Sequence, residues 1–589
     1  MTRPLDKLQI KIFGILALAV FAAYGSSLRN KHFVYDDAFI IAKNPFLHEG
    51  SAGIVPILST GYWEAVDGQA AKVQEYRPVL MLSFLAQILI FGFSILSLQL
   101  GNIFLHLIVC CLLWEILRRK IGPAAALAGA LVYAVMPIHS EAVALLTGRS
   151  EVLSAAFLLS AWLALESEIR EGLAAGLVLY GLAVLTKESS VLFPVFMALN
   201  DWVFFNRKPW DKQSRAGQIG LWLTTVAALL PRMLVLPAPF HGGTPYFKTG
   251  HLIAALTFAK FGLEHYLWPS LTGTGLCTDY SRPLIPDSSP ASAAAWLPML
   301  LVCAIAAAAA WKILRNKSAW AFWLLAPCLF LLPTSNLILS LDTLGAERFL
   351  YWPTIGLAAA WGFLYQETKK ISPRLARFWL FFLCASYTIL LIRRNRIWNS
   401  PLDFARAEVA CNPVSAKAWS SLGSALILKG DPEAGAADLK HAVALNPELS
   451  DPYYNIARLE FSRGEMAAAR ASLRAALRRD PQSTDAWVLL GLCAEKERRD
   501  KAALSDYETA VRINPANALA QFDAGRICLL ASDFDCARRH WGSYLRLAPE
   551  EPQAPAVRDW LSRLNSSGPP IPARSNAEKG SPKAEDKRN

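Results

Sequence analysis

The sequence has little charge for its length. Only 18% of its 589 residues are Asp, Glu, Lys or Arg, where a soluble globular chain has about a quarter. Hydrophobic residues make up 54%. Charged residues are sparse up to about residue 395 and dense after it. These features exclude a single soluble domain, and they divide the chain near Trp398 into a part suited to lipid and a part suited to water.

The sequence also lacks two other features. It has no CxxC pair with metal-ligand spacing, and its basic residues form no continuous face. Several of its ten cysteines lie inside apolar runs, so we expect neither a zinc site nor a disulfide framework. Cys528 and Cys536 are close in sequence, and we expect buried free thiols there, with pairing as the alternative. The net charge of +12 comes from short clusters between apolar runs, which argues against nucleic-acid binding.

Long apolar stretches fill the first 395 residues. A spanning helix needs about 20 mostly apolar residues. The candidate spans, eleven in all, lie near 9–27, 98–117, 121–138, 152–166, 172–186, 189–205, 217–237, 293–312, 318–333, 351–366 and 377–393. Two more apolar stretches, near 79–95 and 251–268, are interpreted as interfacial helices. We take the first span as uncleaved, because no small-residue cleavage site follows it.

Lys and Arg gather in short loops that set the predicted topology. These loops are the N-terminus, 118–120, 207–215, 312–317 and 369–377. With eleven spans they share one side, which the positive-inside rule makes cytoplasmic. The loop after the first span and the C-terminal third then face the periplasm or a lumen. Arg394 and its basic neighbours, at an outer span end, oppose this topology unless a phosphate headgroup holds them. Short loops and Ala-rich repeats favour a bacterial inner membrane.

The last third of the chain repeats itself every 34 residues. Prolines recur at this interval, at Pro413, Pro447, Pro481, Pro515 and Pro549. Small residues keep the same period, and so do aromatic residues four positions before them, at Trp419, Tyr453 and Trp487. This is the period of the tetratricopeptide repeat, a helical hairpin that stacks into a solenoid.

We therefore predict an all-α protein with three parts: a multispan domain over 1–395, four to five repeats over 396–565, and a disordered tail over 566–589. Stacked hairpins form a concave groove that binds extended peptide. The alternative is a solenoid that only docks to its own membrane domain.

Ionisable residues cluster in the loops predicted to face outward. Such groups are costly at membrane level, so each is a functional hypothesis. The set comprises Asp36, Asp37, Glu75, Arg77, His139, Glu141, Arg149, Glu151, Lys187, Glu188, Glu264, His265, Glu347 and Arg348. Any one of them could merely solvate a span end. Together, acids and bases from six loops indicate an active site at the membrane surface.

Six motifs in order resemble one known family. They are VYDDAFIIAKNP, EYRPV, MPIHSEAVALLTGRSEVLSA, LTKESSV, LPTSNLI and AERFLYWPTIG, followed by the repeats. This series is similar to the transmembrane and tetratricopeptide-repeat-containing protein family over roughly residues 10–560. That family looks like a branch of the C-type glycosyltransferases, which use polyprenyl-phosphate sugars, and its eukaryotic members are protein O-mannosyltransferases.

The resemblance implies a glycosyltransferase that moves a sugar, with mannose as a candidate, from a polyprenyl phosphate to a protein or glycan hydroxyl. One carboxylate suffices as base, because the leaving phosphate is already a stable anion. The family's acidic pair falls on Asp36 and Asp37, and we favour Asp36 as the base. No cofactor is expected; some superfamily members hold a divalent metal, but the site predicted here is metal-free.

Cations are needed to hold the donor phosphate. The residues assigned to this role are Arg348, Lys187, Arg149 and Arg77. Arg348 is the first choice, and its alternative role is to pair with Glu347 or another acid. Residues that could position the sugar or the acceptor are His139, Glu141, Glu188 and Glu347. A structural role is the alternative for His139.

Two other functions compete with the enzyme. A membrane-anchored repeat scaffold for envelope or secretion assembly would need one span rather than eleven, and no acid–base set. A lipid-linked-sugar transporter would need charged residues near mid-span and paired repeats in the membrane half, where Leu, Ala and Phe predominate. The expected partners of the enzyme are the polyprenyl-phosphate sugar, an acceptor protein or peptide bound by the repeats, and the bilayer.

Overall fold

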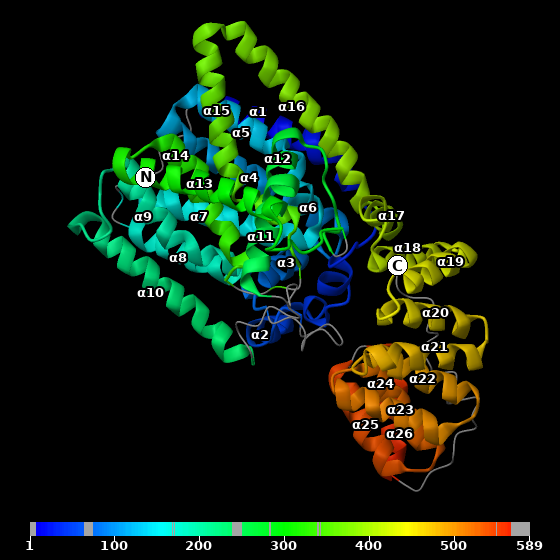
Figure 1. Cartoon of the computed structure of the whole chain (residues 1–589). Helices are drawn as coiled ribbons and strands as arrows, with labels where there is room; N and C mark the ends of the chain where they lie inside the picture. Colours follow the sequence, from blue (N-terminus) through cyan, green and yellow to red (C-terminus); the bar gives the residue numbers. More distant parts are fainter. Residues whose placement is uncertain are drawn as a thin grey trace. The chain divides into compact units, whose positions relative to one another are not determined.

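The computed structural model describes residues 7–63, 75–167, 169, 171–237, 250–281, 284–338, 341, 343–548 and 551–566. All regular elements in these ranges are helices, which confirms the all-α prediction. The chain forms two compact units, one reaching Asn412 and one beginning at Pro413 (Figure 1). The tail predicted to be disordered lies, apart from Ser566, outside the described residues.

Helices α1 to α17 build the first unit (Figure 1). They are α1 Lys7–Tyr24, α2 Ile54–Ser59, α3 Pro78–Phe91, α4 Ile95–Ile121, α5 Pro123–Val135, α6 Ser140–Ala144, α7 Arg149–Leu165, α8 Gly172–Thr186, α9 Phe193–Phe204, α10 Lys212–Val235, α11 His251–Phe261, α12 Trp268–Thr272, α13 Ala293–Asn316, α14 Ala319–Leu325, α15 Thr354–Ile371, α16 Pro373–Asn395 and α17 Pro401–Cys411. Between α5 and α6 lies a short 3-10 turn, Pro137–His139.

Five helical segments among the described residues are long and apolar enough to cross a membrane. They contain α1, α4, most of α10, α13 and α16. The segment from α5 to α6 could be a sixth span, bent by 52° at Met136. Other apolar helices, such as α3 and α8, are shorter. The predicted number of eleven spans is therefore not confirmed.

Antiparallel packing gives the first unit two distinct ends. Helix α1 runs against α4, since the rings of Phe13 and Trp114 lie 5.7 Å apart and those of Tyr24 and His106 lie 5.2 Å apart. Helix α15 runs against α5 in the same way. The beginning of α4 and the end of α5 therefore lie at one end of the unit, and the basic turn between α4 and α5 lies at the other.

Basic side chains meet at this second end. Lys120 donates to Glu166 at 2.8 Å, and its ammonium lies 4.5 Å from the ring centroid of Phe204. Lys317, after α13, lies 4.8 Å from the ring of Trp202 on α9. The end of α15 lies beyond the start of α5, so Lys369 is also at this end. The basic loops were predicted to lie on one side of the membrane, and these three loops lie at one end of the unit.

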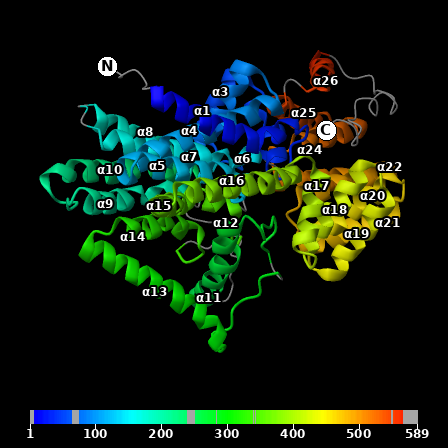
Figure 2. The same cartoon turned by 90° about the horizontal axis from the view of Figure 1, so that it is seen from above.

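Close contact between α5 and α15 depends on glycine. A Cβ at Gly129 would overlap the carbonyl oxygen of Ala358, and one at Gly362 would overlap that of Ala125. Small residues allow such approach between membrane helices, where packing rather than hydrophobicity drives association. By contrast, α13 lies at the periphery and contacts α11 and α14 (Figure 2), and most of its side chains are exposed at the surface of the unit.

The second unit is a solenoid of helical hairpins. Its helices are α18 Ala416–Lys429, α19 Pro432–Leu445, α20 Ser450–Ser462, α21 Met466–Arg479, α22 Thr484–Lys496, α23 Asp500–Ile513, α24 Ala518–Leu530, α25 Phe534–Leu547 and α26 Ala554–Ser566. The prolines and aromatic residues of the repeat meet in one hydrogen bond. Trp419, Tyr453 and Trp487 each donate to the carbonyl of the proline six residues earlier, at 2.8, 3.2 and 2.9 Å. Gln521 does the same in the fourth repeat. Pro549 lies outside the described residues.

The prediction that Cys528 and Cys536 are free thiols is wrong. They form a disulfide across the α24–α25 hairpin, with Cα atoms 5.7 Å apart. A second disulfide joins Cys277 to Cys411, so the expected lack of disulfides is wrong as well. The turn between two packed helices brings the first pair together. The second pair meets across 134 residues of chain, which no local spacing could indicate.

We expect Gly129→Ala to lower the free energy of unfolding by about 1–3 kcal/mol, because the added methyl group forces α5 and α15 apart. The matched control is Gly14→Ala on α1, where a Cβ meets nothing within 4 Å. Unfolding by sodium dodecyl sulfate in detergent micelles measures both. Equal stability of the two variants would contradict the close packing of α5 on α15.

Candidate active site

The acidic pair lies in the loop after α1. Asp37 is buried, and its carboxylate accepts hydrogen bonds from the backbone N–H groups of Leu146 at 3.0 Å and Thr147 at 2.8 Å. Burial raises the pKa of Asp37 to about 7, although these two donors lower it. Asp36 is half-buried. Asp37 thus anchors the loop to the segment before α7, and Asp36 is the more accessible carboxylate.

Arg348 is the centre of the site. It lies in the 3-10 turn Glu347–Leu350, before α15. Its guanidinium pairs with Glu141 at 2.5 Å, and its backbone N–H donates to the same carboxylate at 3.0 Å. Burial lowers the pKa of Arg348, but the negative charges of Glu141 and Asp36 raise it by more. The pKa of Arg348 therefore lies above its ordinary value. Residues far apart in sequence thus place an arginine beside the acidic pair.

A second cation flanks the same turn. The ammonium of Lys187 lies 4.9 Å from the ring centroid of Phe349, and the guanidinium of Arg348 lies 5.5 Å from it. Lys187 also pairs with Glu151, and both side chains are buried. Burial lowers the pKa of Lys187, while Glu151 raises it. Burial prevails, so the pKa of Lys187 lies below its ordinary value, and Glu151 is the main group that opposes this shift.

Arg77 and Glu188 form a third pair. Arg77 donates to both oxygens of Glu188, at 3.2 and 2.7 Å, and to Glu75 at 2.9 Å. Its guanidinium also lies 5.3 Å from the ring centroid of Tyr62. Burial lowers the pKa of Arg77, but the carboxylates of Glu188 and Glu75 raise it by more. The Coulomb interactions of Glu188 and Arg77 with Lys187 link this pair to the preceding one.

Glu347 has hydrogen-bond partners different from those of its neighbour Arg348. Its buried carboxylate accepts from Arg394 at 2.8 Å and from the hydroxyl of Tyr280 at 3.3 Å. Burial raises its pKa to about 7, although Arg394 lowers it. Neither Arg394 nor Tyr280 was predicted as a site residue. Only the basic cluster at the end of α16 could have pointed to Arg394, and nothing in the sequence pointed to Tyr280.

Arg149 and His139 are buried and bonded to other parts of the helix bundle. Arg149 is 2% exposed and donates to Asn102 at 2.7 Å and Gln87 at 2.7 Å, which ties α7 to α3 and α4. The ring of His139 is bonded to the Tyr133 carbonyl at 3.1 Å and the Thr354 hydroxyl at 2.8 Å. Both arrangements support the packing below the site, and no contact with substrate is needed to explain them.

A group of three potential metal ligands among the described residues lies in the second unit, at Cys528, Cys536 and His540. The two sulfur atoms are bonded to each other, so they are not available as thiolates. The site around Arg348 contains both cations and carboxylates, most of them paired. The absence of a metal from this site stays a prediction.

The fold and the site define a multispan membrane protein that carries a repeat solenoid and a cluster of ion pairs at one end of its membrane unit. A family model described as dolichyl-phosphate-mannose-protein mannosyltransferase matches residues 77–235. Tetratricopeptide-repeat models match residues 416–449 and 454–518. The first match includes Arg77, Glu141 and Lys187, and the acidic pair and Arg348 lie outside it.

Curated relatives carry the similarity over both units. Human protein O-mannosyl-transferase TMTC3 is 25% identical over 456 residues, which are 71% of this chain and 50% of the relative. Protein O-mannosyl-transferase Tmtc1 of Drosophila melanogaster is 26% identical over 544 residues, 75% of this chain and 62% of the relative. The chain spans about half the length of the first of these. The resemblance to transmembrane and tetratricopeptide-repeat-containing O-mannosyl-transferases is thereby confirmed.

We expect Lys187→Met to destabilise the protein by about 3–5 kcal/mol, because Glu151 is left buried without its partner. Adding Glu151→Leu should restore most of this loss. The control is Lys370→Met, which breaks an ion pair whose side chains are 62% and 63% exposed and should cost about 0–1 kcal/mol. Equal losses at Lys187 and Lys370, measured by the same micelle unfolding assay, would contradict the burial of the first pair.

The raised pKa of Asp37 predicts a pH dependence of stability. The folded protein keeps the proton up to about pH 7, whereas the unfolded chain releases it near 3.8. Stability present at low pH is therefore lost as the pH rises through about 7. Between about pH 5 and about pH 8 the melting temperature should fall, and less so in Asp37→Asn, with Glu347 keeping part of the slope. An unchanged slope in the variant would contradict a protonated Asp37.

Proposed function

We propose that this protein transfers mannose from a polyprenyl-phosphate donor to a hydroxyl of an acceptor protein. The observation that carries the proposal is the ion pair of Arg348 with Glu141, at a point where the charge of Asp36 also raises the pKa of Arg348. The relatives are named protein O-mannosyl-transferases, which supports the sugar and the acceptor class. A carboxylate next to a partly buried guanidinium provides the base and the phosphate ligand that this reaction needs.

In the proposed reaction the acceptor hydroxyl attacks the anomeric carbon of mannose. A carbon–oxygen bond forms there, and the bond from that carbon to the phosphate oxygen breaks. The electron pair of the broken bond leaves with the polyprenyl phosphate, and the hydroxyl proton passes to Asp36. Arg348 stabilises the departing phosphate, and Lys187, which also lies against the ring of Phe349, adds positive charge. Asp37 keeps the loop in place through its hydrogen bonds to Leu146 and Thr147.

The site is proposed to face the outside of a bacterial inner membrane. The basic clusters at the opposite end of the unit support this orientation through the positive-inside rule. The disulfides give independent support, because such bonds persist in oxidising compartments and are rare in the cytosol. Cys277–Cys411 lies at the end that holds Glu347 and Arg394. No candidate span follows α16 in the described part of the chain, so the repeats belong to the same side.

The repeats are proposed to bind the acceptor protein in an extended form. A concave face lined by successive helices is the usual peptide surface of such a solenoid. The scaffold alternative loses support, because a mere anchor would gain nothing from buried ion pairs that cost several kcal/mol to desolvate.

The test is transfer of radiolabelled mannose from a polyprenyl-phosphate donor to membrane protein. Asp36→Asn should lower kcat by roughly 10²–10⁴-fold, the usual contribution of a general base. Glu367→Gln is the matched control, since Glu367 is an exposed carboxylate at the basic end of the unit and its loss should leave transfer unchanged.

The Asp36 and Glu367 variants must be compared at equal expression and equal melting temperature. Equal activity of Asp36→Asn and the wild type would remove this carboxylate from the mechanism. A wild type that transfers mannose from no polyprenyl-phosphate donor would overturn the proposed function itself.

A further inference from the structure

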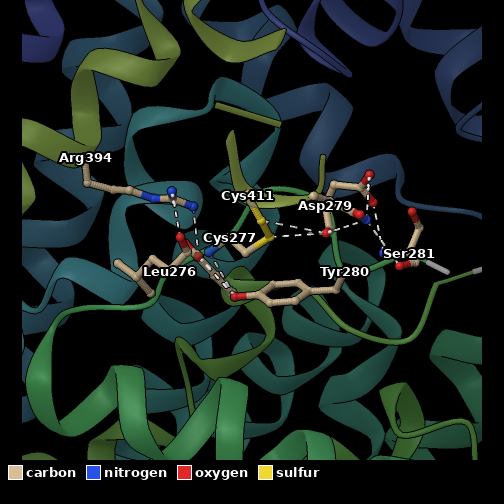
Figure 3. The surroundings of a disulfide bond; sticks show 9 residues. Leu276, Cys277, Asp279, Tyr280, Ser281, Arg394 and Cys411 are labelled. Carbon is tan, nitrogen blue, oxygen red and sulfur yellow. Dashed lines mark hydrogen bonds and ion pairs between the residues drawn. A yellow bond between two sulfur atoms is a disulfide. The ribbon is translucent and has the colours of Figure 1, made fainter. Parts of the chain in front are cut away.

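The Cys277–Cys411 disulfide joins the loop after α12 to the last residue of α17 (Figure 3). The next residue strengthens this connection. The side-chain amide of Asn412 donates to the backbone oxygen of Asp279 at 3.4 Å and to that of Ser281 at 3.3 Å. Residues 277–281 are therefore fixed to the end of the first unit by one covalent bond and several hydrogen bonds.

The same loop supports Glu347. The backbone N–H of Cys277 donates to the hydroxyl of Tyr280 at 3.1 Å, and that hydroxyl donates to Glu347 at 3.3 Å. Arg394 donates to the Leu276 carbonyl at 3.3 Å with one guanidinium nitrogen and to Glu347 at 2.8 Å with another (Figure 3). The side chain of Glu347 is 0% exposed, so water is not at hand to replace these donors.

Glu347 begins the turn that carries Arg348. The two side chains are held by different partners, Glu347 by Tyr280 of the disulfide loop and by Arg394, and Arg348 by Glu141. We propose that the Cys277–Cys411 disulfide, acting through Tyr280 and Arg394, positions the Glu347–Arg348 turn for binding of the donor phosphate. This inference rests on the proposed function, in which Arg348 is the phosphate ligand. The cysteines, Tyr280 and Arg394 are positioning residues.

The physical reason lies in the geometry of charge-assisted hydrogen bonds. Their contribution falls steeply when donor and acceptor are misplaced, and a shift of about 1 Å far from the reacting atoms is enough to cost up to about 10²-fold in rate. Without the disulfide, the loop holding Tyr280 is free to move, and Glu347 loses one of its donors. The turn then shifts, and with it the guanidinium of Arg348.

Kinetics of the full chain in detergent test this inference. In Cys277→Ala/Cys411→Ala we expect the KM for polyprenyl-phosphate mannose to rise by about tenfold and kcat to fall, with the KM for the acceptor nearly unchanged. The matched control is Cys528→Ala/Cys536→Ala, which removes the other disulfide and should leave the KM for the donor as it is. An unchanged donor KM in the first variant, or an equal rise in both, would overturn the proposal.

A double-mutant cycle separates positioning from a general loss of structure. In an Arg348→Met background the donor KM is already raised, and removal of the Cys277–Cys411 bond should raise it no further. A full additional rise would show that the bond acts elsewhere. Tyr280→Phe, which keeps the ring and removes the hydroxyl, should give a smaller rise in donor KM that also vanishes in the Arg348→Met background.

Hydrogen exchange tests, without any reference to activity, whether the Cys277–Cys411 disulfide holds the Glu347–Arg348 turn in place. This hold is called the clamp below. Dithiothreitol gives two electrons and two protons to the disulfide, which becomes two thiols, and is itself oxidised to its cyclic disulfide. Reduction should speed amide exchange in residues 276–281 and 347–350 of the wild type, and not in Cys277→Ala/Cys411→Ala. If the wild type transfers no sugar, the proposed function fails while this measurement still decides on the clamp. Unchanged exchange in residues 347–350 would overturn the clamp.

Discussion

The ion pair between Arg348 and Glu141 holds the site together. It joins segments 207 residues apart in the sequence. The turn that carries Arg348 also contacts other charged residues of the site. On one side Arg348 adjoins Phe349 and, through its ring, Lys187. On the other side the preceding residue, Glu347, is bonded to Arg394. An unpaired charge at this depth would be costly, whereas a paired one keeps its ionised form and its orientation. The pairing therefore makes a cluster of charges possible at the surface of an apolar helix bundle.

The same constraint explains the two ends of the membrane unit. Charges have no partner in hydrocarbon, so they gather where the helices end. One end carries acids and bases in roughly equal number, held in pairs with specific geometry. The other carries mainly lysine and arginine, with Lys120 and Lys317 lying against aromatic rings. The glycine contacts between α5 and α15 keep the bundle close-packed between these ends. The basic surface at one end and the paired charges at the other fit the proposed orientation, in which the basic end faces the cytoplasm.

The sequence predicted most of this arrangement, and the exceptions have physical causes. The repeats were predictable because a 34-residue period places Trp419, Tyr453 and Trp487 in equivalent hydrogen bonds. Asp36, Glu141, Lys187 and Arg348 were assigned to one site because the predicted topology places them on one membrane face, and their roles stay a prediction. The partners within that set did not follow, because long-range pairing leaves no local pattern: Arg348 pairs with Glu141, and Glu347 with Arg394. The Cys277–Cys411 disulfide was missed for the same reason, whereas the Cys528–Cys536 pair is local and its pairing was only the alternative to free thiols. The number of spans was not confirmed, because several apolar helices are too short to be counted as spans by length alone.

The central claim is that the donor phosphate binds at the end of the membrane unit that holds Arg348. The most direct measurement is a cryo-electron microscopy structure of the full chain with a polyprenyl-phosphate mannose analogue. Phosphate density is expected within hydrogen-bonding distance of the Arg348 guanidinium, with the sugar between it and Asp36. Density for the donor at the opposite end, among Lys120, Arg207 and Lys317, would contradict binding of the phosphate by Arg348.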